Sequence, residues 1–199
     1  MLFRWIFRLS GWRVDDDVPP ETHRSVMIAA PHTSNWDFIV TRIAFSILRI
    51  PVRFTIKKEW LRFPFRRLML ALGAIGIDRS PKRPGQDRPS MTDAMAALFD
   101  EHQRLVVLVT PEGTRSLRTQ WKTGFYYVAL KAGVPITLGY VDYRRKVAGV
   151  GAVIHPSGDF EADMARIMDF YRSKHPAHPE LFSLDERFDG SQNRPASNS

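Results

Sequence analysis

Apolar residues recur with two spacings in this chain, and the two spacings alternate along the sequence. Short, nearly continuous apolar runs are typical of strands buried on both faces, whereas apolar residues that return every three or four positions are typical of helices. The runs predict strands at residues 26–30, 52–56, 74–77, 105–109, 134–141 and 147–154. The helical spacing predicts helices at residues 35–48, 59–72, 90–103, 125–131 and 160–174. This alternation favours an α/β layered fold with a mostly parallel central sheet flanked by helices.

The N-terminus carries a pattern of its own, which predicts an amphipathic helix within residues 1–12. Its apolar and basic side chains fall near different faces of a helix, with Trp5, Ile6 and Leu9 on one and Arg4 and Arg8 on another. Arginines flanked by aromatics are typical of helices that contact a membrane surface. The same pattern also fits a terminal helix that docks on the protein and covers the core.

Length and composition indicate a folded protein with one core. The chain has 199 residues, of which 44% are apolar, and it contains five Trp and thirteen Phe. We expect a single domain over residues 1–188 and a disordered polar tail over 189–199. There is no cysteine, so disulfides, thiolate nucleophiles and zinc–thiolate sites are excluded.

The charge distribution predicts an anionic membrane surface as a partner. The formal net charge is +8, and residues 42–88 hold twelve cations against three acids, interleaved with aromatic and aliphatic residues. No nucleic-acid reading motif is recognisable, so nucleic acid is not an expected partner. No apolar run reaches the roughly 18 to 20 residues that span a bilayer, and no secretory signal is evident. We therefore expect a peripheral protein on the cytoplasmic face of a membrane.

The turn between the first predicted strand and the first long helix holds a histidine and a carboxylate. His32 and Asp37 are five residues apart, which on one continuous helix would place them on different sides. With His32 in the turn and Asp37 in the first helical turn, the side chains can meet, and the carboxylate leaves one ring nitrogen free as a general base. The alternative is structural: Ser34 caps the helix, Asp37 complements its dipole, and His32 is an ordinary loop residue.

Charged clusters also follow two further predicted strands. Asp78 and Arg79 come after residues 74–77, and Glu112 and Arg115 follow residues 105–109. Because functional sites of open α/β sheets gather at the carboxyl ends of strands, we expect the three clusters to form one site. Glu112 and Arg115 taken alone could equally form a local surface ion pair.

Four blocks of sequence, in this order and spacing, resemble the glycerophospholipid acyltransferase family, which includes the lysophosphatidic acid acyltransferases. The blocks are His32-x4-Asp37, Gly76-Ile77-Asp78-Arg79, Pro111-Glu112-Gly113-Thr114-Arg115-Ser116 and Val134-Pro135-Ile136. The resemblance covers roughly residues 32–136. The chain departs from the usual family pattern at Pro31, Gly76 and Thr110, which leaves the identity of the acceptor open.

The resemblance implies transfer of a fatty acyl group from an acyl carrier protein or coenzyme A thioester to the hydroxyl of a lyso-lipid acceptor. It implies that His32 is the general base and that Asp37 orients it. It assigns the acceptor's head group to Arg79, Glu112, Gly113, Thr114 and Arg115, with a phosphate contact from Lys122, and the acyl side of the site to Val134, Pro135 and Ile136. It implies no metal and no cofactor besides the thioester.

Two other functions remain open at this point. A phospholipid–lysophospholipid transacylase would use the same motifs without a thioester donor. A basic membrane-binding protein could keep the fold without activity. A metal site is not expected, since His155, His175 and His178 lack partner ligands at suitable spacing.

Overall fold

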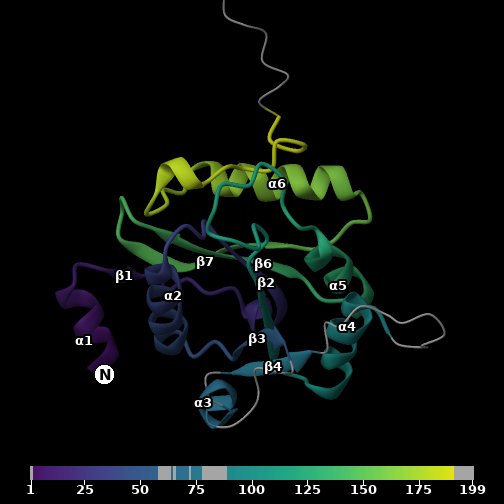
Figure 1. Cartoon of the computed structure of the whole chain (residues 1–199), viewed down its shortest axis with the longest axis horizontal. Helices are drawn as coiled ribbons and strands as arrows, with labels where there is room; N and C mark the ends of the chain where they lie inside the picture. The colour runs from purple at the N-terminus through teal and green to yellow at the C-terminus, as the bar shows by residue number, and fades with distance from the viewer. Residues whose placement is uncertain (1, 58–63, 65, 72, 78–88, 191–199) are drawn as a thin grey trace, which may run out of the picture.

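The computed structural model describes residues 2–57, 64, 66–71, 73–77 and 89–190, and its centre is a seven-stranded sheet with helices on both faces (Figure 1). The strands lie in the order β1-β7-β6-β2-β5-β3-β4, and neighbours are parallel except β6 and β7. Their bounds are β1 Arg13–Val14, β2 Arg24–Ala30, β3 Val52–Lys57, β4 Ala74–Ile77, β5 Leu105–Val109, β6 Ile136–Asp142 and β7 Val147–Ile154. The predicted α/β class with a mostly parallel sheet is confirmed.

Each predicted helix has a counterpart whose ends differ by a few residues. The α-helices are α1 Leu2–Leu9, α2 Asn35–Ile47, α3 Arg66–Ala71, α4 Met91–Glu101, α5 Gly124–Ala132 and α6 Phe160–Arg172. Two short 3₁₀ helices, η1 Pro20–His23 and η3 Pro179–Leu181, and the two-residue strand β1 had no periodic signal and were not predicted. The part of the predicted helix 59–72 that precedes α3 lies mostly outside the described residues.

Two helical layers cover the sheet, because both faces of its central strands are apolar. On β2, Val26 and Ile28 pack into the larger core cluster, which includes residues of α4, α5 and α6. The intervening Met27 points to the opposite face and packs with Phe45 of α2. Figure 1 shows α6 along the upper side of the sheet, with α1 and α2 at lower left.

The N-terminal helix α1 docks on α2 through the buried side chain of Phe7. Phe7 is buried among Val40 and Ala44 of α2, and Gly11, with φ +80°, follows the end of the helix. Trp5 and Leu9 are instead exposed, at 68% and 77%. One side of α1 thus packs on α2, and another side exposes apolar residues to solvent. Among the helices of the described residues, none is both long and apolar enough to cross a bilayer.

The strand order brings three strand ends to one edge of the sheet. β2 lies between β6 and β5 and is parallel to both, with Ile28 opposite Val109 and Ala30 opposite Tyr140. The turns that follow Ala30, Val109 and Asp142 therefore lie side by side. The candidate site is built from these three turns.

Candidate active site

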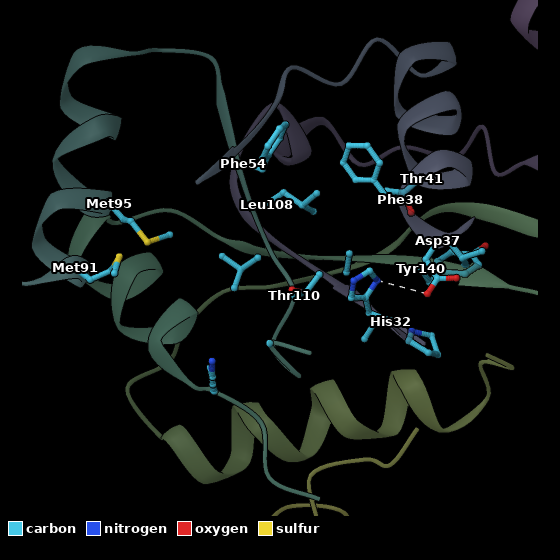
Figure 2. A pocket seen from close by; sticks show the side chains of 17 residues that line it. His32, Asp37, Phe38, Thr41, Phe54, Met91, Met95, Leu108, Thr110 and Tyr140 are labelled. Carbon is cyan, nitrogen blue, oxygen red and sulfur yellow. Dashed lines mark ion pairs between the residues drawn. The ribbon is translucent and has the colours of Figure 1, made fainter. Parts of the chain in front are cut away.

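His32 and Asp37 meet at the strand-to-helix turn between β2 and α2. Nδ1 of His32 lies 3.5 Å from Oδ2 of Asp37, a contact drawn as a dashed line in Figure 2. Asp37 is buried, whereas the side chain of His32 is 22% exposed and lines the cavity described below. The carboxylate thus faces Nδ1 and leaves Nε2 as the ring nitrogen available to take a proton.

The carboxylate of Asp37 is held by several donors. Oδ2 accepts the backbone N–H groups of Thr33 and Ser34 at 2.7 and 2.8 Å, and Oδ1 accepts the hydroxyl of Tyr143 at 2.6 Å. Burial acts to raise the pKa of Asp37, but the hydrogen bonds from His32, Tyr143, Ser34 and Thr33 outweigh it and lower the pKa overall. Asp37 therefore stays ionised beside the imidazole.

The helix cap and the contact with His32 are both present at this turn, whereas the catalytic role of His32 stays a prediction. Ser34 is the N-cap of α2, its side chain accepts the N–H of Trp36, and it forms a capping box with Asp37. One carboxylate therefore caps the helix and faces His32. The cap fixes the position from which Asp37 contacts the imidazole ring.

Glu112 lies behind His32 and does not face the cavity. Its side chain is buried, and both carboxylate oxygens accept the backbone N–H of His32 at 3.1 Å. The pKa of Glu112 is raised to about 8, because burial and the nearby charge of Asp37 raise it by more than the bond from His32 lowers it. In this structure Glu112 supports the His32 turn, and its predicted contact with a head group stays a prediction.

An apolar cavity of about 500 Å³ opens beside His32. Its walls come from β2, β3, β5, β6, α2 and α4. Figure 2 shows Met91 and Met95 of α4 on one side, Phe38 and Thr41 of α2 on the other, and Leu108 of β5 between them. Apolar walls with a few polar groups, among them His32, are typical of a site for a partly apolar ligand.

A polar recess adjoins the cavity and shares His32 with it. The recess is lined by His32, Thr110, Gly113, Thr114 and Arg115. Arg115 is exposed and donates a hydrogen bond to Oδ1 of Asn35 in the first turn of α2. A guanidinium in an open recess is suited to an anionic group such as a phosphate.

Gly113 allows Lys122 to approach the same recess. Its φ of +68° favours glycine, and a Cβ added there would lie 2.7 Å from Nζ of Lys122. Lys122 is exposed and lines the apolar cavity near its polar end. The predicted residues His32, Asp37, Gly113, Thr114, Arg115 and Lys122 are thus brought together.

The remaining predicted residues are not brought to this site. Arg79 lies outside the described residues. Val134 and Ile136 are buried in the larger core cluster, and Val26 of β2 pairs with Ile136. Because the cavity lies at the carboxyl ends of the parallel strands, residues at the amino end of β6 are at the opposite edge of the sheet. The acyl role predicted for Val134, Pro135 and Ile136 therefore has no geometric support.

Tyr143 and the apolar walls were missed at the sequence level. Tyr143 directly follows β6, so the rule that selected His32 at the end of β2 would have selected it too. Phe38, Phe54 and Met91 carry no signal beyond ordinary amphipathic spacing, because the cavity forms only when separate elements converge. Within the described ranges, no three His, Asp or Glu side chains gather closely enough to hold a metal ion.

The sequence and the fold are both similar to known acyltransferases. Residues 13–137 match the family model described as Acyltransferase. The curated 1-acyl-sn-glycerol-3-phosphate acyltransferases of Salmonella typhimurium and Escherichia coli are each 29% identical to this chain, over 143 and 141 residues. These alignments cover 68% of this chain and 55% of each relative, so the chain spans about half the length of the curated relatives it matches.

A solved structure shares the fold. The crystal structure of the 1-acyl-sn-glycerophosphate (LPA) acyltransferase PlsC from Thermotoga maritima matches with a TM-score of 0.56 and 15% sequence identity. The match covers 85% of this chain and 74% of that chain. At this identity the likeness supports the layered α/β fold alone.

Proposed function

This chain belongs to the acyltransferase family, and we propose on that premise that it transfers a fatty acyl group from a thioester to the hydroxyl of a lysophosphatidic acid-like acceptor. The observation that carries the proposal is the place of His32. Its side chain lines both the apolar cavity and the polar recess that contains Arg115. An amphiphilic acceptor and an acyl donor both need such a junction, with a base at the point where they meet.

The reaction follows from the geometry of the pair. Nε2 of His32 takes the proton of the acceptor hydroxyl, and the oxygen attacks the thioester carbonyl carbon. The carbon–sulfur bond breaks, and the thiolate leaves and takes the proton back from the imidazolium. The ionised carboxylate of Asp37, beside Nδ1 of His32, stabilises the imidazolium between the two proton transfers. Because a thioester is already activated toward attack by a hydroxyl, no acyl-enzyme intermediate is needed. The thioester is the co-substrate of the reaction.

In this proposal the two ends of the substrates bind in different compartments. The acyl chain occupies the apolar cavity between Phe38, Leu108 and Met95. The phosphate of the acceptor binds at Arg115 and Lys122, and the resemblance adds Arg79 to that set. Acyl carrier protein and coenzyme A thioesters both remain possible donors in this scheme, since either presents the same reacting group.

We place the protein at the cytoplasmic face of a membrane, as a peripheral enzyme. Trp5, Leu9 and Trp36 are large apolar side chains exposed by 68%, 77% and 65% on α1 and α2. The net charge of +8 adds attraction to anionic lipids. A lyso-lipid acceptor resides in such a surface, so binding there brings the enzyme to its substrate.

One experiment tests the proposal against its alternatives. The purified chain is incubated with lysophosphatidic acid and other lyso-lipids, with acyl carrier protein and coenzyme A thioesters, and products are identified by mass spectrometry. Phosphatidic acid formed only with a thioester, and lost in His32→Ala, supports the proposal. Product formed from a phospholipid donor alone indicates a transacylase instead. Vesicle binding without product from any donor indicates a non-catalytic membrane protein.

A further inference from the structure

The two carboxylate oxygens of Asp37 are held in different ways. Oδ2 lies at the turn, where it accepts the N–H groups of Thr33 and Ser34 and faces Nδ1 of His32. Oδ1 is reached, among the described residues, by the hydroxyl of Tyr143 at 2.6 Å. Without that bond, no donor from the described part of the chain would hold Oδ1, and the carboxylate plane could rotate away from the imidazole.

Tyr143 is itself held in place from two directions. Its backbone N–H donates to the carbonyl of His175 at 2.9 Å. Its ring packs edge-on against Trp12, with ring centroids 5.1 Å apart at an angle of 87°. Burial and the hydrogen bond to Asp37 both raise the pKa of Tyr143, so the phenol remains a donor across the working pH range.

Trp12 connects this contact to the N-terminal helix. The ring centroids of Trp12 and Phe7 are 5.9 Å apart, and the backbone N–H of Trp12 donates to the backbone carbonyl of Phe7 at 3.0 Å. Phe7 is the buried side chain by which α1 docks on α2. A continuous set of contacts thus runs from α1 through Phe7, Trp12 and Tyr143 to Asp37.

We infer that Tyr143 is a positioning residue that fixes the orientation of Asp37 toward His32, and that Trp12 supports it from the N-terminal segment. Tyr143 is not among the residues that line the cavity or the recess, so it acts through Asp37 and not on substrate. The inference rests on the proposed function, because turnover is one of its readouts. It also makes a structural claim about Asp37 that does not need turnover.

The test is Tyr143→Phe, which removes the hydroxyl and keeps the ring. We expect kcat to fall about tenfold, as for loss of a hydrogen bond to a charged group, with KM for both substrates within about twofold. We also expect the pKa of Asp37 to rise, measured by ¹³C NMR titration of the carboxyl, whose signal is assigned with Asp37→Asn. The charged or titratable groups that face Asp37 are His32, Tyr143 and Glu112, and the first and last are unchanged in this variant.

A matched control removes a tyrosine–carboxylate bond elsewhere. The hydroxyl of Tyr126 donates to buried Asp163 at 3.0 Å, away from the cavity. Tyr126→Phe should lower stability but leave kcat and the Asp37 titration as in the wild type. Equal kinetic effects in the two variants would mean that Tyr143 contributes stability alone, and the inference would fail.

A second variant tests the role of Trp12 and guards against misfolding of the first. Trp12→Leu leaves the Tyr143 hydroxyl in place, and we expect a smaller loss of kcat than in Tyr143→Phe. Because Trp12 acts through Tyr143, the double variant should be no slower than Tyr143→Phe; additive losses would overturn the coupling. If the wild type transfers no acyl group, the proposed function fails. The pKa of Asp37 in Tyr143→Phe then tests by itself whether Tyr143 holds the carboxylate of Asp37.

Discussion

Both carboxylate oxygens of Glu112 accept the backbone N–H of His32, at 3.1 Å each. Glu112 follows β5 and His32 follows β2, and these strands are parallel neighbours in the sheet. The block that contains Glu112 therefore supports the block that contains His32. Two segments 80 residues apart are thus joined into one structural unit.

Removal of this support should cost both stability and turnover. In Glu112→Ala the N–H of His32 loses its acceptor inside the protein, and we expect a loss of about 1–3 kcal/mol in unfolding free energy together with a fall in kcat. Glu112→Gln keeps a carbonyl oxygen at the same place and should retain more of both. Denaturant unfolding and steady-state kinetics compare the two. A Gln variant as impaired as the Ala variant would show that an acceptor oxygen at this place is not what supports the His32 turn.

The pKa of Glu112 gives the stability of the protein a pH dependence. Its pKa is raised from 4.5 to about 8 in the folded protein, so its contribution to stability is present below pH 4.5 and is lost as the pH rises toward 8. The slope is at most about 1.4 kcal/mol per pH unit for one proton. Glu112→Gln removes the titratable carboxyl group, so the unfolding free energy should depend less on pH between about pH 5 and pH 8. An unchanged slope in that variant would place the titration elsewhere.

Substitution of His32 should separate catalysis from folding. We expect His32→Ala to lower kcat by at least about 10², because general-base catalysis contributes roughly 10²–10⁴. The turn should persist, since Glu112 contacts the backbone of His32 and not its ring. His155→Ala, at an exposed histidine outside both cavities, is the control. Turnover near that of the wild type in His32→Ala would exclude His32 as the base.

Gly113→Ala should disturb the polar recess through Lys122. An alanine at φ +68° costs roughly 1–2 kcal/mol, and its Cβ would lie 2.7 Å from Nζ, so the ammonium group has to move. We expect lower stability and a higher KM for the acceptor. Gly158→Ala, at φ +91° with no atom within 4 Å of the new Cβ, carries similar strain alone. The prediction fails if both variants have the same KM.

The role of Arg115 is tested by the charge of the acceptor. Arg115→Ala should raise KM for lysophosphatidic acid by roughly 10- to 100-fold, which corresponds to the loss of a hydrogen bond between charged groups. KM for monoacylglycerol, which lacks the phosphate, should change little. Arg118→Ala removes an exposed arginine three residues along the chain and serves as the control. If Arg115→Ala raises KM equally for both acceptors, Arg115 acts through its contact with Asn35 and does not bind the phosphate.

The sequence by itself determined most of the elements and singled out His32 and Asp37 as the candidate catalytic pair. Residues 105–109 form β5 as predicted, because a short, nearly continuous apolar run is a local signal of a strand buried on both faces. The capping box of Ser34 and Asp37 is also local, since it depends on a spacing of three residues. His32 and Glu112 each stand shortly after a predicted strand, which is enough to place both at the carboxyl edge of a parallel sheet.

The tertiary structure decided what each side chain at that edge contacts. Only the strand order places β6 beside β2, so only the fold brings Tyr143 to Asp37. The same order turns Glu112 toward the backbone of His32 and leaves Val134 and Ile136 in the core at the far edge. Strand order depends on which distant faces bury one another, and no local period carries that information. The sequence therefore indicates the candidate catalytic residues, whereas the fold determines their supporting contacts and the cavity.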